Sequence, residues 1–179
     1  MDSSLPPIVG VMGSGAESHD DLAKSVADVL IDLPASLLTG GGGGVMAAVA
    51  KAYVESPKRT AGLSIGIVPC IPEDPTTPKK GYPNPYVEVP ILTHLPISGD
   101  RGEEIGSRNH INILSSIAVV ALPGRQGTAS EVALALRYNK PVIIYCEDRN
   151  DVAHFPEKAE RTTEIDRVRE FLDAVVTKI

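Results

Sequence analysis

Residues 106–136 read GSRNHINILSSIAVVALPGRQGTASEVALAL, and this stretch decides the fold. Its middle, residues 117–122, is a run of Ile, Ala, Val and Leu with the length and composition of a strand buried on both faces. The loop PGRQG at 123–127 ends that run. Thr128 and Glu131 then form a Thr-x-x-Glu capping box, which predicts that a helix begins at Thr128. Such a loop turns backbone N–H groups and the positive end of a helix dipole toward the end of the strand, so the stretch predicts an anion site, most often for phosphate.

Strands and helices alternate along the rest of the chain. We expect strands at 8–12, 36–38, 64–68, 87–92, 118–122 and 141–145. We expect helices from Ser18, after Gly44, over 103–114, from Thr128, and from about Thr163 with an apolar stripe that ends at Ile179. This alternation predicts an α/β fold: a single Rossmann-like domain over 1–179, with a parallel sheet and helices on both faces.

Prolines gather in residues 69–90, which hold seven of the fifteen in the chain. Proline has no N–H and breaks helices and central strands, so this segment predicts a long loop at the strand ends. Two roles stay open for it, a lid over a site and a contact between subunits.

Three glycine turns follow predicted strands, at 13–15, 40–44 and 124–127. Ligands of parallel sheets bind at the carboxyl ends of the strands, so these turns should converge on one pocket. The five consecutive glycines at 40–44 cost about 0.5–1 kcal/mol each relative to Ala. They are either a flexible linker or a loop that a ligand approaches closely, and their place between a strand and a helix favours the ligand loop.

Composition excludes several classes of function. The net charge of −6 argues against a nucleic-acid groove. No apolar run reaches the ~18–20 residues of a membrane helix, and residues 1–7 show no signal peptide. Cys70 and Cys146 lie far apart without metal spacing, which predicts a reduced, cytoplasmic protein.

The motifs exclude further classes. Ser18 stands where a dinucleotide fingerprint has its third glycine, and no acid ends the second strand, so NAD binding is disfavoured. There is no G-x-x-x-x-G-K-[ST] loop and no G-x-S-x-G motif, which argues against a P-loop NTPase and a serine hydrolase. The four histidines are scattered and form no ligand pair, so no structural metal is expected.

Charged residues near the anion site each allow two interpretations. Glu131 is either a capping residue that reaches back to Thr128, or a carboxylate at the pocket rim that acts as a general base or accepts from ribose hydroxyls. Arg108 is either a solvated surface residue or a phosphate clamp, and Arg101 and Arg125 compete for the same role.

The motif P-G-x-x-G-T-x-x-E at 123–131 resembles the signature of the lonely guy superfamily, Rossmann-like proteins often mislabelled as lysine decarboxylases. Its enzymes cleave the N-glycosidic bond of nucleoside 5′-monophosphates such as cytokinin ribotides. The resemblance implies catalytic roles for Arg108 and Glu131. Two positions depart from the enzyme pattern: Asn109 stands where a lysine is usual, and Arg125 stands where a second glycine is usual.

The chain is most similar to the molybdenum-cofactor carrier branch of that superfamily. The matching motifs are R-x-x-I-N-x-L-S-S at 108–116, G-T-A-x-E-V-A-L-A-L at 127–136, K-P-V at 140–142 and the glycine turns with their flanking residues. This resemblance implies a binding or carrier protein that holds the phosphate of the molybdenum cofactor (molybdopterin), or a related oxyanion such as molybdate. The cofactor-binding residues it then implies are Gly13, Ser14, Thr39, Gly41, Gly42, Gly43, Gly44, Arg108, Asn112, Gly124, Arg125, Gly127, Thr128 and Glu131.

The alternative is an N-glycosidic phosphoribohydrolase, with Arg108 stabilising charge and Glu131 binding ribose hydroxyls or activating water. Both hypotheses use these two residues, whereas Asn109 and Arg125 favour binding. A third hypothesis, handling of single-stranded DNA, conflicts with the net charge of −6. The expected partners are a small phosphorylated ligand, further copies of the chain in a homodimer or homotetramer, and molybdoenzymes as recipients of the cofactor, without a membrane or nucleic acid.

Overall fold

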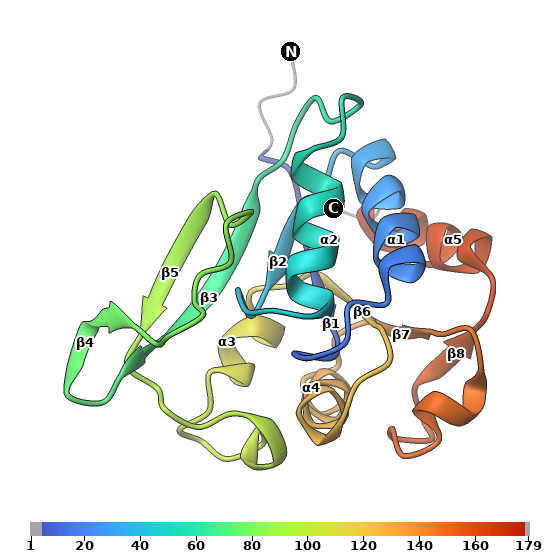
Figure 1. Ribbon diagram of the computed structural model, residues 1–179. Helices are drawn as coiled ribbons and strands as arrows, with labels where there is room; N and C mark the ends of the chain where they lie inside the picture. The colour runs from blue at the N-terminus through green and yellow to red at the C-terminus, as the bar shows by residue number, and fades with distance from the viewer. Residues whose placement is uncertain (1–4, 178–179) are drawn as a thin grey trace.

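An eight-stranded sheet forms the middle of the molecule (Figure 1). The computed structural model describes residues 5–177, so residues 1–4 and the predicted end of the apolar stripe at Ile179 lie outside the described part. The strands are β1 (Ile8–Met12), β2 (Ser36–Thr39), β3 (Ser64–Ile71), β4 (Asp74–Pro78), β5 (Val89–Thr93), β6 (Ala118–Ala121), β7 (Val142–Tyr145) and β8 (Glu160–Thr162). The helices are α1 (Asp20–Asp32), α2 (Val45–Val54), α3 (Asn109–Leu114), α4 (Gln126–Arg137) and α5 (Ile165–Val176), with short 3-10 turns η1 (Gly99–Arg101) and η2 (Arg149–Val152).

The strand order is β4-β3-β2-β1-β6-β7-β8, and β5 also pairs with β3. Every pairing is parallel except that of β4, which runs antiparallel to the end of β3. The chain moves outward from β1 through β2 to β3, then returns to place β6 on the other side of β1. The order therefore reverses between β1 and β6, where parallel sheets open a crevice for ligands. The Rossmann-like α/β fold predicted from the alternation is confirmed.

Helices cover the sheet on both faces, each over its own apolar core (Figure 1). On one face α1, α2 and α5 pack on inward residues such as Val9, Leu37 and Val120. On the other face α3 and α4 pack on Leu38 and Val119 among others. All four residues of β6 are buried, as the apolar run at 117–122 predicted.

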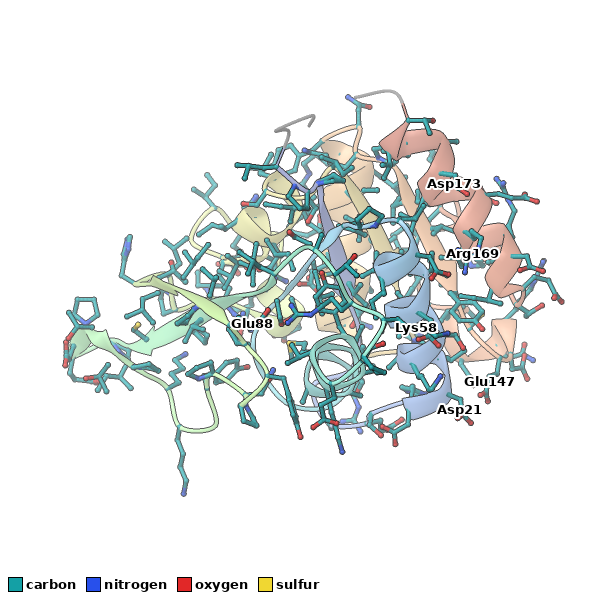
Figure 2. The ribbon with its side chains drawn as sticks, turned by 90° about the horizontal axis from the view of Figure 1, so that it is seen from above. Asp21, Lys58, Glu88, Glu147, Arg169 and Asp173 are labelled. Carbon is teal, nitrogen blue, oxygen red and sulfur yellow. The ribbon has the colours of Figure 1, made fainter. Side chains whose placement is uncertain are left out.

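Charged side chains lie on the outer surface of the helices, as the view from above shows (Figure 2). Arg169 on α5 donates from Nη2 to Asp32 Oδ2 at the end of α1, at 2.8 Å, and ties these two helices together. No helix within residues 5–177 has both the length and the apolar character needed to cross a lipid bilayer.

Four expectations about elements need correction. The proline-rich segment 69–90 is not all loop, because the end of β3 and β4 form a hairpin within it. The solvent-exposed residues of β4 explain this, since an edge strand can tolerate prolines that a central strand cannot. The helix expected over 103–114 begins only at Asn109, after turns, and β8 was not anticipated.

The fourth correction concerns the start of α4. The helix begins at Gln126, with Arg125 as its N-cap residue, and no side chain caps it. The carbonyl of Arg125 accepts the N–H groups of Thr128 and Ala129 at 3.0 and 3.1 Å. Thr128 therefore lies inside the first turn, so the predicted capping box is wrong. Glu131 does not cap the helix, and its carboxyl is available to other groups.

Candidate functional site

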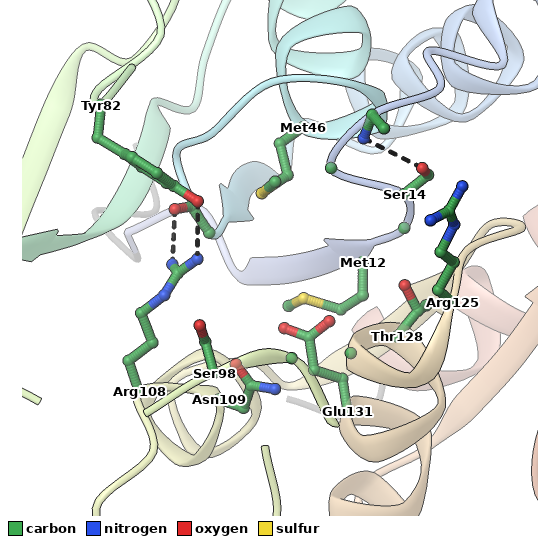
Figure 3. Close-up of a pocket in the computed structure, with 16 residues that line it drawn as sticks. Met12, Ser14, Met46, Tyr82, Ser98, Arg108, Asn109, Arg125, Thr128 and Glu131 are labelled. Atoms are coloured by element: carbon green, nitrogen blue, oxygen red, sulfur yellow. Dashed lines mark hydrogen bonds between the residues drawn. The ribbon is translucent and has the colours of Figure 1, made fainter. Parts of the chain in front are cut away.

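A cavity of about 330 Å³ opens where β1, β2 and β6 end, at the crevice that the strand order creates (Figure 3). The predicted site residues that line it are Gly13, Ser14, Arg108, Arg125, Gly127, Thr128 and Glu131. Three further lining residues, Gly15, Gly40 and Asn109, were noted in the sequence without being assigned to the ligand. The lining residues that the sequence did not single out are Met12, Ala16, Met46, Tyr82, Ser98 and Gly99. Thr39, Gly41, Gly42, Gly43, Gly44, Asn112 and Gly124 lie outside the lining.

Ser14 joins the three glycine turns at one end of the cavity. Its N–H donates to the carbonyl of Pro123 at 3.0 Å, and its carbonyl accepts from Val45 N at 2.8 Å. Its hydroxyl accepts from the N–H groups of Ala16 and Glu17 at 3.2 and 2.9 Å. The turns after β1, β2 and β6 thus converge as predicted.

Two glycines allow these turns to approach. A Cβ at Gly13 would lie 2.7–2.8 Å from the side chain of Val45, and one at Gly124 would lie 2.2 Å from Thr128 Oγ1. Gly124 itself lines an adjoining hollow with Glu17, His19 and Asp151 rather than the main cavity. Its role is to let the loop pack against α4.

The N-terminus of α4 faces the same end of the cavity. Gly127 and Thr128 lie in the first turn of this twelve-residue helix and line the cavity. The N–H groups of Thr128 and Ala129 already donate to the carbonyl of Arg125, so the N–H groups of Gln126 and Gly127 at the start of the helix face a ligand, and the helix dipole adds positive potential. The exposed guanidinium of Arg125 stands at this end beside Ser14 (Figure 3). The arrangement suits a phosphate or another tetrahedral oxyanion.

The run of five glycines at 40–44 allows close packing within the protein rather than contact with a ligand in the cavity. Only Gly40 lines the cavity. A Cβ at Gly42 would meet Met46 and Tyr82 at 2.9 Å, and one at Gly44, where φ is +58°, would meet the carbonyl oxygen of Ser14 at 2.3 Å. The hydroxyl of Thr39 accepts from Gly41 N at 3.1 Å within the loop. The close approach that the sequence suggested is real, but the approaching groups are the chain's own side chains and turns.

Arg108 is neither a solvated residue nor a freely moving clamp. It is buried, and its Nη1 donates to the carbonyls of Gly40, directly after β2, and of Ile67, within β3, at 2.7 and 2.6 Å. Nη2 makes a long contact of 3.4 Å with the hydroxyl of Tyr82, and the guanidinium lies 5.4 Å from the centre of that ring. Nε is buried and has no hydrogen-bond partner among the described residues. Arg108 therefore keeps donor capacity at the wall of the cavity.

The structure separates the three arginines that competed for the anion. Arg101 is exposed and pairs with Glu104 at 2.6 Å, outside the cavity. Arg108 and Arg125 both line the cavity, on opposite sides in Figure 3. Two cationic positions thus face one small volume.

Glu131 points into the cavity from α4, one turn after Thr128 (Figure 3). Burial raises the pKa of its carboxyl from 4.5 to about 7, while the hydrogen bond from Asn112 and the charge of Arg108 act to lower that pKa. Asn112 Nδ2 donates to Oε1 at 2.8 Å, and no other described side chain donates to the carboxyl. Asn112, predicted to face the ligand, instead orients Glu131 from behind the cavity wall.

Tyr82 was missed because the proline-rich segment gave no local signal for a pocket residue. Asn84, two residues on, is buried and donates from its backbone N to Gly41 O at 2.8 Å and from Nδ2 to Gly42 O at 2.9 Å. These bonds hold Tyr82 against the glycine run. Residues 82–84, which we call the strap, therefore close one side of the cavity.

Asn109, which replaces the lysine usual in the related enzymes, is fixed by the protein. Its Nδ2 donates to Ser130 Oγ at 3.1 Å, and its backbone N–H donates to Ser107 Oγ. Residues 5–177 contain no group of three or more His, Cys, Asp or Glu side chains that could hold a metal ion.

Comparison with known proteins extends this picture. The model of the SLOG cluster4 family matches residues 6–173. The chain belongs to the SLOG cluster4 family. This places it in the lonely guy superfamily near the molybdenum-cofactor carrier branch, as the motifs indicated. An uncharacterised protein of Archaeoglobus fulgidus is 33% identical over 136 residues, which are 75% of this chain and 76% of that protein.

Solved structures with the same architecture include proteins named for a cofactor. The molybdenum cofactor binding protein of the phototrophic bacterium Rippkaea orientalis is 29% identical with a TM-score of 0.71, over 97% of this chain and 99% of that one. The molybdenum cofactor carrier protein of Chlamydomonas reinhardtii is 26% identical with a TM-score of 0.70, over 96% and 99% of the two chains. A third structure, TM1055, is 18% identical with a TM-score of 0.67 over 94% and 99%, and shares the fold.

Proposed function

We propose that this member of the SLOG cluster4 family binds a phosphate-bearing cofactor of the molybdopterin type in the cavity beside α4. The phosphate would accept hydrogen bonds from the N–H groups that begin α4 and from the hydroxyl of Ser14, and Arg125 would add charge. The names of the relatives from Rippkaea orientalis and Chlamydomonas reinhardtii support this ligand. Molybdate, another tetrahedral oxyanion, would suit the same donors.

The observation that carries the proposal is the unpartnered Nε of buried Arg108. A buried guanidinium donor without an acceptor costs free energy, and an acceptor atom of the cofactor away from its phosphate would supply one, because Arg108 lies across the cavity from Arg125 (Figure 3). The two carbonyls that hold Nη1 fix the guanidinium before the ligand arrives. The residues present therefore fit an anionic cofactor.

Titration with molybdenum cofactor and with inorganic phosphate tests the proposal. Arg125→Ala should weaken both by about tenfold or more, the scale of one charge-assisted hydrogen bond. Arg101→Ala is the matched control, because it removes an exposed arginine that pairs with Glu104 outside the cavity. Equal affinities in the two variants would contradict the assignment of the anion to this end of the cavity.

A phosphoribohydrolase is the second candidate, because Arg108 and Glu131 both line the cavity and the pKa of Glu131 near 7 suits a general base at neutral pH. Incubation with a panel of nucleoside 5′-monophosphates distinguishes the two functions. Release of free base that disappears in Glu131→Gln would favour the hydrolase. A folded protein that releases no base from any member of the panel would favour the carrier.

Three further features belong to the proposal. The protein would assemble into a homodimer or homotetramer, and it would pass the cofactor to molybdoenzymes. It would work in a reducing compartment such as the cytoplasm, since Cys70 and Cys146 are free and buried.

A further inference from the structure

The cavity has two chemically different parts. The part formed by Ser14, Thr128 and Arg125 offers hydrogen-bond donors and positive charge (Figure 3). Away from it, Glu131 offers a carboxylate, the side chains of Tyr82 and Met46 offer an apolar surface, and the buried guanidinium of Arg108 lies beside the Tyr82 ring. A phosphate fits the first part, so the second part receives the rest of the ligand.

Glu131 presents an acceptor to that second part. Asn112 holds Oε1 from behind, which fixes the orientation of the carboxyl and leaves Oε2 without a donor among the described side chains. An ionised carboxylate has room for about four hydrogen bonds over its two oxygens. A ligand that brings adjacent N–H donors would satisfy it and would favour its charged form.

Tyr82 and Met46 form a wall of the same cavity that this carboxylate lines. A Cβ built on Gly42 would lie 2.9 Å from Met46 Cε and 2.9 Å from Tyr82 Cε1, so the two side chains meet above this glycine. Asn84 anchors the strap on the carbonyls of the glycine run, which holds the wall in place. An aromatic ring with a polarisable thioether beside it suits the face of a flat heterocycle.

We propose that Glu131 reads the ring of the ligand by accepting the paired N–H groups of a 2-amino-4-oxopyrimidine edge, while Tyr82 and Met46 pack on the ring face. This proposal rests on the proposed function, because it takes the phosphate to lie at the Ser14 end. Pterins and guanines share this edge, with a ring N–H next to an exocyclic amino group. Adenine, lumazine and hypoxanthine lack that donor pair.

Matched ligand pairs test the proposal without the intact cofactor. Pterin should bind about tenfold or more tightly than lumazine, and GMP than IMP, because each second ligand lacks the 2-amino donor. Comparison of pterin with GMP then distinguishes the two sources of the same edge. Inorganic phosphate, measured in parallel, reports on the Ser14 end alone.

Variants assign the preference to Glu131. Glu131→Gln replaces one acceptor oxygen by a donor, so the pterin-over-lumazine preference should fall to less than about threefold while phosphate affinity stays within about twofold. Glu104→Gln is the matched control, since Glu104 is exposed and pairs with Arg101. Tyr82→Ala removes the aromatic face and should weaken pterin and lumazine alike.

The outcomes separate the two proposals. Phosphate binding with no preference in either ligand pair, or a preference that survives in a folded Glu131→Gln, would overturn the assignment to Glu131 and leave the phosphate site intact. Absence of binding for phosphate and for the molybdenum cofactor would overturn the proposed function and this inference together. Thermal melts of each variant show that loss of binding is not loss of folding.

Discussion

Glu131 carries its carboxyl into a buried position that favours the protonated form. Its pKa is raised by burial from 4.5 to about 7, so the folded state holds the proton more tightly than the unfolded state does. The resulting stability is complete below pH 4.5 and is lost as the pH rises through about 7. A pKa difference of this size between the folded and unfolded states corresponds to about 3 kcal/mol in the free energy of unfolding.

Glu131→Gln should remove this pH dependence. The variant cannot ionise at this position, so the ligand-free variant should be more stable than the native protein at pH 8 and lose the advantage toward pH 4.5. Urea unfolding at several pH values measures the difference. Glu104→Gln serves as a control, because Arg101 lowers the pKa of Glu104 and the effect there has the opposite sign. The same pH slope in native protein and Glu131→Gln would contradict the burial argument.

Thr128 is not an N-cap residue, because α4 begins at Gln126, two positions before the start that the sequence predicted. No side chain caps α4, so Thr128→Val should cost less than the ~1 kcal/mol of a lost N-cap. The hydroxyl lines the cavity, so phosphate affinity should fall in the same variant. Denaturant unfolding and phosphate titration on one preparation check both parts. A loss of about 1 kcal/mol in stability with unchanged phosphate affinity would instead support the N-cap role that the sequence predicted for Thr128.

The strap is anchored on the glycine run by one buried side chain, that of Asn84. Asn84 Nδ2 donates to Gly42 O at 2.9 Å, and its Oδ1 accepts from Tyr86 N at 3.0 Å. Asn84→Ala leaves buried backbone groups without partners, which should cost about 1–3 kcal/mol and weaken ring ligands more than phosphate. Asn150→Ala, which removes contacts to Asp148 at an exposed turn, should change stability far less. Similar losses in the two variants would show that the strap does not depend on this anchor.

The elements differ in how far sequence could predict them. The strands β1, β2, β3 and β6 and the three glycine turns followed from local signals, because apolar runs and glycines act over a few residues. The partners of Arg108 could not follow, since Gly40, Ile67 and Tyr82 lie between 26 and 68 residues away in the chain. The start of α4 was misplaced because a capping box is a local pattern, whereas the loop that precedes the helix is fixed by Ser14 across the sheet.

At the scale of the whole molecule, the strand order brings the residues of the candidate site together. Reversal between β1 and β6 brings together turns that are more than a hundred residues apart, and Ser14 N donates to Pro123 O at that junction. The parallel pairing puts all the strand ends that carry glycine turns at one edge. The proposed phosphate site at this junction would combine the N-terminus of α4 with the side chains of Ser14 and Arg125.

The strand β5, which pairs with β3 at one side of the sheet, leaves apolar side chains exposed. Parallel strands are normally buried on both faces, yet Val89, Ile91 and Leu92 of β5 are 36%, 44% and 44% exposed. Adjacent residues of a strand point to opposite faces, so Ile91 and Leu92 expose apolar side chains on both sides of this edge. Contiguous exposed apolar residues of this kind are typical of subunit contacts. The expected homodimer or homotetramer would cover them, with Pro90 keeping the contact from extending the sheet.

Ile91→Lys should therefore shift the protein toward a monomer in sedimentation velocity while its thermal unfolding stays cooperative. A charge placed in an apolar contact between copies must be desolvated, and that cost opposes assembly. Leu114→Lys is the matched control, because Leu114 is similarly exposed, at 51%, but ends α3 on one face of the sheet. If Leu114→Lys dissociates the oligomer and Ile91→Lys does not, the contact runs through α3 instead. A native protein that sediments as a monomer would contradict the expected homodimer or homotetramer.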